Sequence, residues 1–295
     1  MAISASMVKE LRERTGAGMM ECKKALVETG GDMDGAVELL RKSGQAKADK
    51  KSGRVAADGR VVITADGKQA AMVEINSETD FVAKDDNFTA FAESVAASVL
   101  AGDAADVDGL SAESLADGRT VEAARTELVT KVGENISVRR FARIQAADHL
   151  GSYAHGARIG AMVSLQGGDA ELARDIAMHV AATNPVCIDE SGVPADTLER
   201  ERRIFAEQAA ESGKPPEIVE KMVNGRIAKF LKEITLLGQP FVKDPDTSVA
   251  KLLQGAGATV TQMIRYEVGE GIEKKEENFA EEVAKQIEES KQKAG

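Results

Sequence analysis

Residues 71–85, with the sequence AMVEINSETDFVAKD, join an apolar run to a polar segment that carries one large aromatic side chain. The apolar part predicts a β-strand, and the helical spacing of apolar residues that begins near Asn87 predicts a helix. Residues 77–85 therefore connect a strand to a helix and place Asp80 beside Phe81. Connections of this kind lie on the protein surface and often carry functional groups. Two interpretations are open: the ring packs into the core, as most loop aromatics do, or it contacts a partner.

The chain on either side of this stretch predicts an α+β fold with antiparallel sheets, built from two related halves. Each half has a hairpin, helices and a closing strand, and the first hairpin turns at Asp66-Gly67, a pair that favours the positive backbone angles of a tight turn. The sequence FVKD at 241–244 echoes FVAKD at 81–85, which favours a repeat. The expected elements are strands at 61–64, 69–75 and 137–144 with helices at 87–101 and 120–133, then a hairpin at 151–165, helices at 169–183 and 247–254, and a strand at 259–268.

The N-terminal part predicts a small bundle of three helices. Glycines at 15–18 end the first helix, Met19–Glu28 forms the second, and the third begins at Asp32 and stops at Gly44. So small a bundle has no room for a buried active site, which indicates a docking unit. Residues 45–58 are charged without an apolar period and indicate a solvated linker, with nucleic-acid contact as the alternative.

Residues 190–235 insert two amphipathic helices into the second half. They are expected at about 196–212 and 216–231, separated by SGKPP at 212–216, which ends one helix and starts the next. A narrow apolar seam on each helix predicts an antiparallel coiled-coil hairpin that projects from the body, either as a site of self-association or as a structural arm. Residues 272–293 predict a charged helix that docks loosely on the body or on a partner.

One further segment, residues 102–119, is acidic and rich in glycine, and it is expected to form a surface loop.

Composition and charge bound the function. The net charge of −11 argues against broad binding to nucleic acid, which depends on Lys and Arg neutralising phosphates. No apolar run approaches the ~20 residues that span a bilayer, and the N-terminus does not have the pattern of a signal peptide. Cys22 and Cys187 form neither a disulfide framework nor a zinc pair, which is typical of the reducing cytoplasm.

Motifs for catalysis or for a cofactor are absent from the sequence. It contains no phosphate-binding loop, and His149, His155 and His179 lack the spacing of metal ligands. Glu78 and Asp80 could act as an acid/base pair, but carboxylates two residues apart are common in loops and nothing nearby would separate their pKa values. A small hydrolase or transferase that uses this pair, and a scaffold that works through the arm, are the two alternatives to a protein-binding factor.

Three stretches closely resemble the signature sequences of the bacterial elongation factor Ts family: RTGAGMMECKKAL at 14–26, TDFVAK at 79–84 and HGARIG at 155–160. They occur in the order of the family, and the resemblance covers nearly the whole chain, with its weakest parts at 102–119 and in the arm. Glu21 stands where the family pattern has Asp, which keeps the charge.

The resemblance implies a guanine-nucleotide exchange factor for the GTPase elongation factor Tu. Such a factor acts in the cytoplasm through protein–protein binding, without covalent chemistry, cofactor or metal, and no direct contact with nucleic acid is expected. The implied architecture has a ubiquitin-associated-like (UBA-like) helical module with a linker at 1–54, a core of two subdomains at 55–147 and at 148–189 with 236–268, a coiled-coil hairpin at 190–235, through which a homodimer could form, and a C-terminal module at 269–295.

The resemblance assigns the wedge that disturbs the magnesium and phosphate site of the GTPase to Thr79, Asp80, Phe81 and Val82. Phe81 would enter an apolar slot between helices of the GTPase domain, and Asp80 would make polar contacts beside it.

Further contacts are implied for Arg12, Met19 and Met20 in the N-terminal module and for His155 in the second core half. The alternative for the two methionines is the three-helix core, and for Arg12 it is a solvated face.

Overall fold

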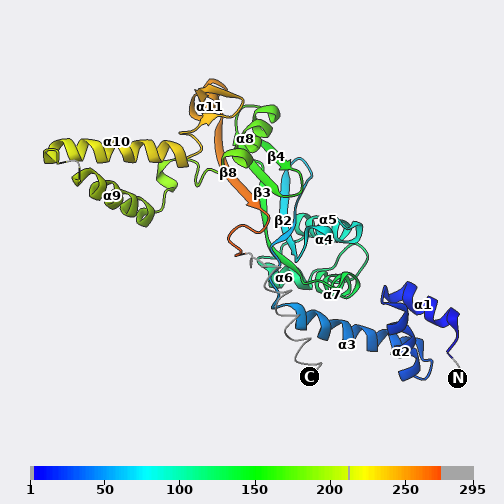
Figure 1. Cartoon of the computed structure of the whole chain (residues 1–295). Helices are drawn as coiled ribbons and strands as arrows, with labels where there is room; N and C mark the ends of the chain where they lie inside the picture. Colours follow the sequence, from blue (N-terminus) through cyan, green and yellow to red (C-terminus); the bar gives the residue numbers. More distant parts are fainter. Residues whose placement is uncertain (1–2, 212, 274–295) are drawn as a thin grey trace, which may run out of the picture.

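The structure is a computed structural model that describes residues 3–211 and 213–273. It is a mixed α+β protein, as predicted. Figure 1 shows an elongated molecule: the N-terminal helices lie at one end, the sheets lie in the middle, and a helical arm projects from the far end. From residue 274 onward, the helix expected at 272–293 lies outside the described residues.

Two antiparallel sheets of three strands form the centre of the molecule, in the orders β1-β2-β3 and β4-β5-β8. In each sheet the second strand of a hairpin is central, and a strand from later in the chain pairs with it. The predicted repeat is therefore present in the topology. The strands are β1 (Asp58–Ala65), β2 (Gln69–Ser77), β3 (Ile136–Gln145), β4 (His149–His155), β5 (Ile159–Gln166) and β8 (Thr259–Glu267).

The first hairpin is confirmed, and its turn is centred on Gly67 and Lys68, one residue later than expected. The carboxylate of Asp66 accepts hydrogen bonds of 2.9 Å from the N–H groups of Lys68 and Gln69, which fixes the turn.

The sequence echo between residues 81–85 and 241–244 does not extend to conformation. Phe81 lies on a short helix, α4 (Asp80–Ala83), and is exposed. Phe241 ends β6 (Pro240–Phe241), which pairs with β7 (Asp244–Ser248), and its buried ring packs on His179 with 5.9 Å between the centroids. The shared letters therefore do not mark the repeat.

The first sheet is covered by α5 (Asp86–Ala101) and α7 (Val121–Val132), both close to their predicted bounds. The expectation of a plain surface loop at 102–119 is wrong. Asp106 caps a further helix, α6 (Val107–Ala112), whose fully buried Leu110 anchors the segment in the core.

The second sheet packs against α8 (Ala170–Thr183), close to its predicted bounds. A Cβ on Gly151 of β4 would lie 2.0 Å from the carbonyl oxygen of Ala173, so this strand needs glycine where the helix crosses it. After a 3₁₀ turn at Glu190–Gly192 the chain enters the arm, and it returns through the β6–β7 pair and α11 (Val249–Gly255).

The N-terminal helices are α1 (Ala5–Thr15), α2 (Met19–Glu28) and α3 (Met33–Lys51). The predicted stop at Gly44 and the solvated linker over residues 45–51 are wrong, because α3 continues to Lys51. Gly44 faces α7, where a Cβ would lie 3.2 Å from Thr130 Oγ1, and Ala48 is buried in the core of the first half. Gly44 therefore allows close packing between two helices and does not end α3.

The arm consists of α9 (Ala195–Ala210) and α10 (Pro216–Ile234), which run in opposite directions and project from the body (Figure 1). Ala209, Val223 and Ile227 are buried between them, and the rings of Phe205 and Phe230 meet edge to face at 6.5 Å. The two helices therefore cover much of their apolar seams themselves.

The two sheets pack directly on each other. A Cβ on Gly160 of β5 would lie 2.6 Å from Val61 and 2.7 Å from the sulfur of Met72, both in the first sheet. The absence of a side chain at Gly160 allows this close approach. Met162 and Ile144 complete a small core between the sheets.

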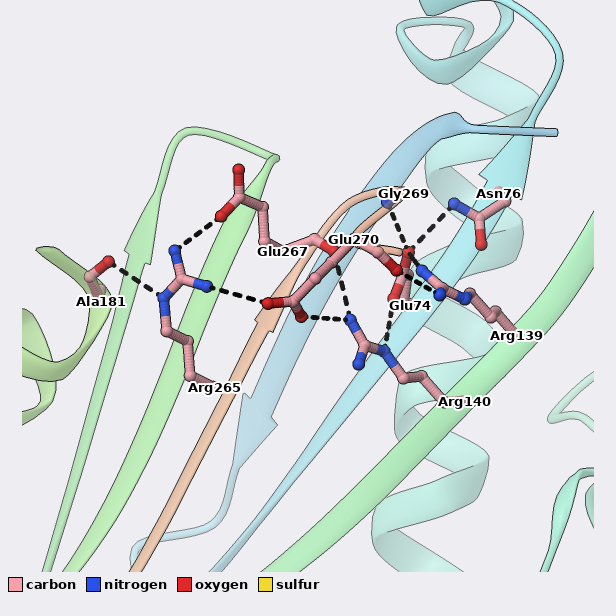
Figure 2. Close-up of polar contacts among 9 residues, drawn as sticks. All are labelled: Glu74, Asn76, Arg139, Arg140, Ala181, Arg265, Glu267, Gly269 and Glu270. Atoms are coloured by element: carbon pink, nitrogen blue, oxygen red, sulfur yellow. Dashed lines mark hydrogen bonds and ion pairs between the residues drawn. The ribbon is translucent and has the colours of Figure 1, made fainter. Parts of the chain in front are cut away.

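A buried carboxylate fastens this junction. Glu74 Oε1 accepts from Arg139 Nη1 at 2.9 Å and from the backbone N–H of Gly269 at 2.8 Å, and Oε2 accepts from Arg140 Nε at 2.6 Å (Figure 2). Glu74 itself has no exposed surface. Burial acts to raise the pKa of Glu74, but these hydrogen bonds together outweigh it, so the pKa lies below its usual value. The site thus joins β2, β3 and the segment that follows β8.

We predict that Glu74→Ala lowers the free energy of unfolding by about 3–5 kcal/mol, because it leaves two arginines without their buried partner. Urea denaturation at neutral pH measures this. Glu38→Ala, which removes an exposed ion pair with Lys42, is the control and should leave the urea midpoint close to that of wild type.

The same carboxylate predicts a pH dependence. Because its pKa is lower in the folded than in the unfolded chain, its contribution is complete above the unfolded value of about 4.3 and is lost as the pH falls through the folded value. Glu74→Ala should lack this part of the acid sensitivity. An equal loss of stability in wild type and variant on acidification would contradict the assignment.

Candidate functional site

The residues predicted as a wedge form a single helical turn with a cap at each end. Thr79 is the N-cap of α4, and its hydroxyl accepts from the N–H of Val82 at 3.4 Å. Asp85 is the N-cap of α5: its carboxylate accepts from the side-chain amide of Asn87 at 2.9 Å and from the N–H of Asn87 at 2.8 Å, and these contacts hold the pKa of Asp85 below its usual range. Because Thr and Asp are favoured N-caps, the sequence starts two helices within seven residues and leaves one turn between the caps.

Phe81 points away from the protein. Its side chain is 81% exposed, the largest value among the large apolar residues of the described chain. Its neighbours anchor the turn: Ala83 is buried, and Val82 packs against the core of the first half. The interpretation that Phe81 packs inward is therefore wrong, and the ring is available to a partner.

The two acidic residues of the segment have separate partners. Asp80 Oδ2 accepts from Lys84 Nζ at 2.6 Å on the same exposed turn. Glu78 Oε1 accepts from the N–H of Asn135 at 2.6 Å and faces Arg54 at 3.4 Å. Glu78 is thus committed to the adjoining turn, while Asp80 lies beside the exposed ring. The two carboxylates therefore have different hydrogen-bond partners.

No sequence pattern indicated the groups that support this turn. Glu134 accepts from the N–H and the hydroxyl of Thr79, and Arg60 of β1 donates to the carbonyl oxygen of Ala83. Glu134 follows Gly133, the left-handed C-cap of α7. The Gly-Glu-Asn sequence could have indicated a turn, but not a contact with a residue 55 positions away.

The predicted contact residues of the N-terminal module also lie on its surface. Met19 is 57% and Met20 77% exposed at the start of α2, and Arg12 is exposed on α1. The alternative that these methionines form the three-helix core is wrong, because Leu26 and other residues of α2 occupy it. Val27 is 61% exposed and stands seven positions after Met20, so both lie on one side of α2. Val27 was not among the predicted contact residues.

His155 ends β4 in the second sheet and is exposed. Its ring stacks on Tyr153 with 6.4 Å between centroids, and Nδ1 lies 3.4 Å from the tyrosine hydroxyl. The structure thus distributes the predicted contacts over three places: the α4 turn, the N-terminal module and the edge of the second sheet.

Within residues 3–211 and 213–273 no group of three or more His, Cys, Asp and Glu side chains could hold a metal ion. His179 is buried, which lowers its pKa, and it donates from Nε2 to Gln239 at 2.9 Å while Nδ1 accepts from the N–H of Val242. Its role is to fasten the loop that holds Phe241 to α8.

A cavity of about 520 Å³ lies between α3 and α7. Several charged side chains on its wall form ion pairs, among them Lys47 with Glu21 and Arg119 with Glu127. It contains none of the predicted contact residues.

None of the helices over the same described ranges is long and apolar enough to cross a membrane.

Comparison with known proteins identifies close relatives. A family model described as Elongation factor TS matches residues 78–270. A curated protein named Elongation factor Ts from Thioalkalivibrio sulfidiphilus is 66% identical over 290 residues, which are 97% of this chain and 99% of that protein. Proteins of the same name from Methylococcus capsulatus and Alkalilimnicola ehrlichii are 62% and 61% identical, over 97% of this chain and 99% of each protein.

The geometry of the α4 turn predicts that Phe81→Ala leaves the stability of the free protein within about 0.5 kcal/mol of wild type, because an exposed ring loses little on removal. Phe88→Ala is the matched control, since that ring is fully buried and its truncation should cost about 3–5 kcal/mol. Thermal and urea denaturation measure both. A loss at Phe81 as large as the loss at Phe88 would contradict the exposed position.

Proposed function

The chain belongs to the elongation factor Ts family and is a translation elongation factor, and from this premise we propose that it is the guanine-nucleotide exchange factor of the GTPase elongation factor Tu. The observation that carries the proposal is the family sequence TDFV displayed on a capped turn with its phenylalanine exposed. The activity would be exerted by binding alone, without a bond made or broken, and in the cytoplasm, where translation proceeds.

The physical requirement for exchange is differential binding. GTPases hold their nucleotide through backbone donors around the phosphates and through a bridging magnesium ion. A factor speeds release if it binds the distorted, empty GTPase more tightly than the loaded one, and the nucleotide then weakens binding of the factor to the same degree. A coupling of about 3 kcal/mol changes the affinity by roughly 150-fold.

Phe81 can supply a coupling of this size. Burial of a phenylalanine side chain contributes about 2–3 kcal/mol, and here the ring is exposed on a turn that is already formed. We propose that Phe81 enters an apolar slot between helices of the GTPase domain that opens in the distorted state. Asp80 lies beside the ring and can exchange its exposed contact with Lys84 for polar contacts to the partner. Thr79 and Val82 would hold the turn while the ring is inserted.

Two further surfaces would hold the partner. We propose that the N-terminal bundle is the UBA-like module of the family and grips the GTPase through Arg12, Met19 and Met20, and that His155 meets another of its domains. The exposed methionines support this, because flexible thioether side chains adapt to apolar partner surfaces.

The α9–α10 pair would be the coiled-coil hairpin of the family, and dimerisation through it stays a prediction. Burial of Val223 and Ile227 between the two helices leaves less apolar surface for a second copy.

We predict that Phe81→Ala slows GDP release by about 30- to 150-fold, the equivalent of the lost 2–3 kcal/mol of apolar burial. Release of a fluorescent GDP from purified elongation factor Tu, with the full chain added, measures this. Ile218→Ala, which trims a 46% exposed apolar side chain on the arm, is the control and should release GDP at the wild-type rate. Slow release with Ile218→Ala and wild-type release with Phe81→Ala would assign the function to the arm, as expected of a scaffold.

Met20→Ala should act differently from Phe81→Ala. Because the module provides a grip and not the wedge, the variant should raise the factor concentration that gives half-maximal release by about tenfold, for the loss of 1–2 kcal/mol of apolar contact, and leave the maximal rate near wild type. A titration of the factor separates the two parameters. A lowered maximal rate with unchanged half-saturation would contradict this role.

A further inference from the structure

We infer that Glu134 is a positioning residue for nucleotide exchange: its carboxylate fixes the one-turn helix that presents Phe81. The inference rests on the proposed function, in which that ring acts on the GTPase. Glu134 is itself half-buried and lies outside the turn, between α7 and β3.

The carboxylate of Glu134 clamps the first residue of the turn at two points. Oε2 accepts from the backbone N–H of Thr79 at 3.0 Å, and Oε1 accepts from its hydroxyl at 2.7 Å. The same hydroxyl oxygen accepts from the N–H of Val82 and so caps α4. A hydrogen-bonded chain therefore runs from Glu134 through the Thr79 side chain into the helical turn. Hydrogen bonds to an ionised acceptor are stronger than those between neutral groups.

Such a clamp is needed because α4 cannot hold its own shape. A helix of four residues is far below the length at which helices are stable alone, so contacts from outside must fix it. At the other end of the turn, Arg60 Nη1 donates to the carbonyl oxygen of Ala83 at 3.3 Å and to Thr89 Oγ1 at 2.8 Å. The turn is thus tethered at both ends while Phe81 between them stays exposed.

Glu134 is in turn held by rigid elements. Gly133 ends α7 in the left-handed conformation, and β3 begins at Ile136. Between them, buried Asn135 donates from its side chain to the carbonyl oxygen of Arg54 at 2.8 Å, and its own N–H donates to Glu78 at 2.6 Å. Residues 133–135 therefore form a fixed turn, called here the α7–β3 turn. Through these contacts it holds Arg54, which precedes β1, and Glu78, which follows β2.

Loss of the clamp should misplace Phe81 without removing it. The N–H of Thr79 would lose its acceptor, and α4 would sample orientations in which the ring no longer fits the slot. Correct orientation of a contacting group can change a rate by orders of magnitude. The remaining contact surfaces would be intact, so the defect should appear in the maximal rate of GDP release more than in the concentration needed for half-saturation.

The test compares Glu134→Ala with a matched control on the same full-length chain. Glu113→Ala removes a chemically equivalent clamp, since Glu113 accepts from the N–H of Ala104 at 2.9 Å and from the hydroxyl of Ser98 at 3.0 Å. Glu113 is half-buried like Glu134, but its contacts are in the 98–113 region and not at α4. Fluorescent-GDP release from elongation factor Tu is titrated with each variant, and unfolding is measured in parallel.

Glu134→Ala should lower the maximal release rate by about tenfold, which corresponds to the loss of a hydrogen bond to a charged group, and Glu113→Ala should leave it unchanged. Glu134→Gln should restore most of the rate, because its amide oxygen can still accept from the N–H of Thr79. In the free protein, amide hydrogen exchange over residues 79–83 should be faster in Glu134→Ala than in Glu113→Ala, even if both unfold at similar temperatures.

Phe81→Ala is included so that the two possible failures can be told apart. Slow release with Phe81→Ala and wild-type release with Glu134→Ala would overturn the positioning role and leave the proposed function standing. Wild-type release with Phe81→Ala would overturn both, since no ring would need positioning. If Glu134→Ala does not fold, Thr79→Val removes the hydroxyl contact from the other side, and a wild-type maximal rate there overturns the inference.

Discussion

The buried carboxylate of Glu74 is the interaction on which the arrangement of the two halves depends. A charge without exposed surface is costly unless paired and hydrogen-bonded, and here it receives donors from β3 and from Gly269 beyond β8 (Figure 2). These donors come from the first sheet and from the segment that directly follows the last strand of the second sheet, so the carboxylate links the two halves where Gly160 lets the sheets touch. Glu74 also lies on β2, the strand that leads at Ser77 directly into the turn of Phe81. The junction and the turn of Phe81 thus share one strand.

Phe81 stays exposed because the residues on both sides of it are fixed by helix caps and by packing on the core. Thr79 and Asp85 cap successive helices, and Val82 and Ala83 face the core, which leaves only one direction for the ring between them. The conformational entropy of forming the turn is lost when the protein folds and not when it meets a partner. More of the free energy gained by burying the ring would then contribute to binding a partner. The same reasoning applies less strongly to Met20, whose unbranched side chain keeps several rotamers.

How much of this could be predicted depends on the range of the interactions. The hairpins, α2, α5 and α7 can be predicted from local periodicity, and the exposed position of Phe81 can be predicted from the family sequence. Glu74 could not be found, because a glutamate within an apolar run gives no sign of the arginines 65 and 66 positions away. The errors at Gly44 and Leu110 have a related cause. A glycine that packs on another helix has the same local pattern as a glycine that ends a helix, and a single buried leucine in an acidic segment does not distinguish a helix from a loop. The role of Glu134 could not be predicted, because its partner Thr79 is 55 positions away in the sequence.

The N-terminal module and the turn of Phe81 are connected through α3 and the α7–β3 turn. Helix α3 begins in the module and ends beside the first core half, where Ala48 is buried and Lys51 Nζ donates to the carbonyl oxygen of Gly133 at 2.5 Å. Gly133 is the first residue of the α7–β3 turn, which holds α4 through Glu134. The proposed grip at Met20 and the proposed wedge at Phe81 therefore lie on segments that are joined through α3 and the α7–β3 turn. In the proposed mechanism, binding energy gained at Met20 would contribute through this link to the distortion that Phe81 causes in the GTPase.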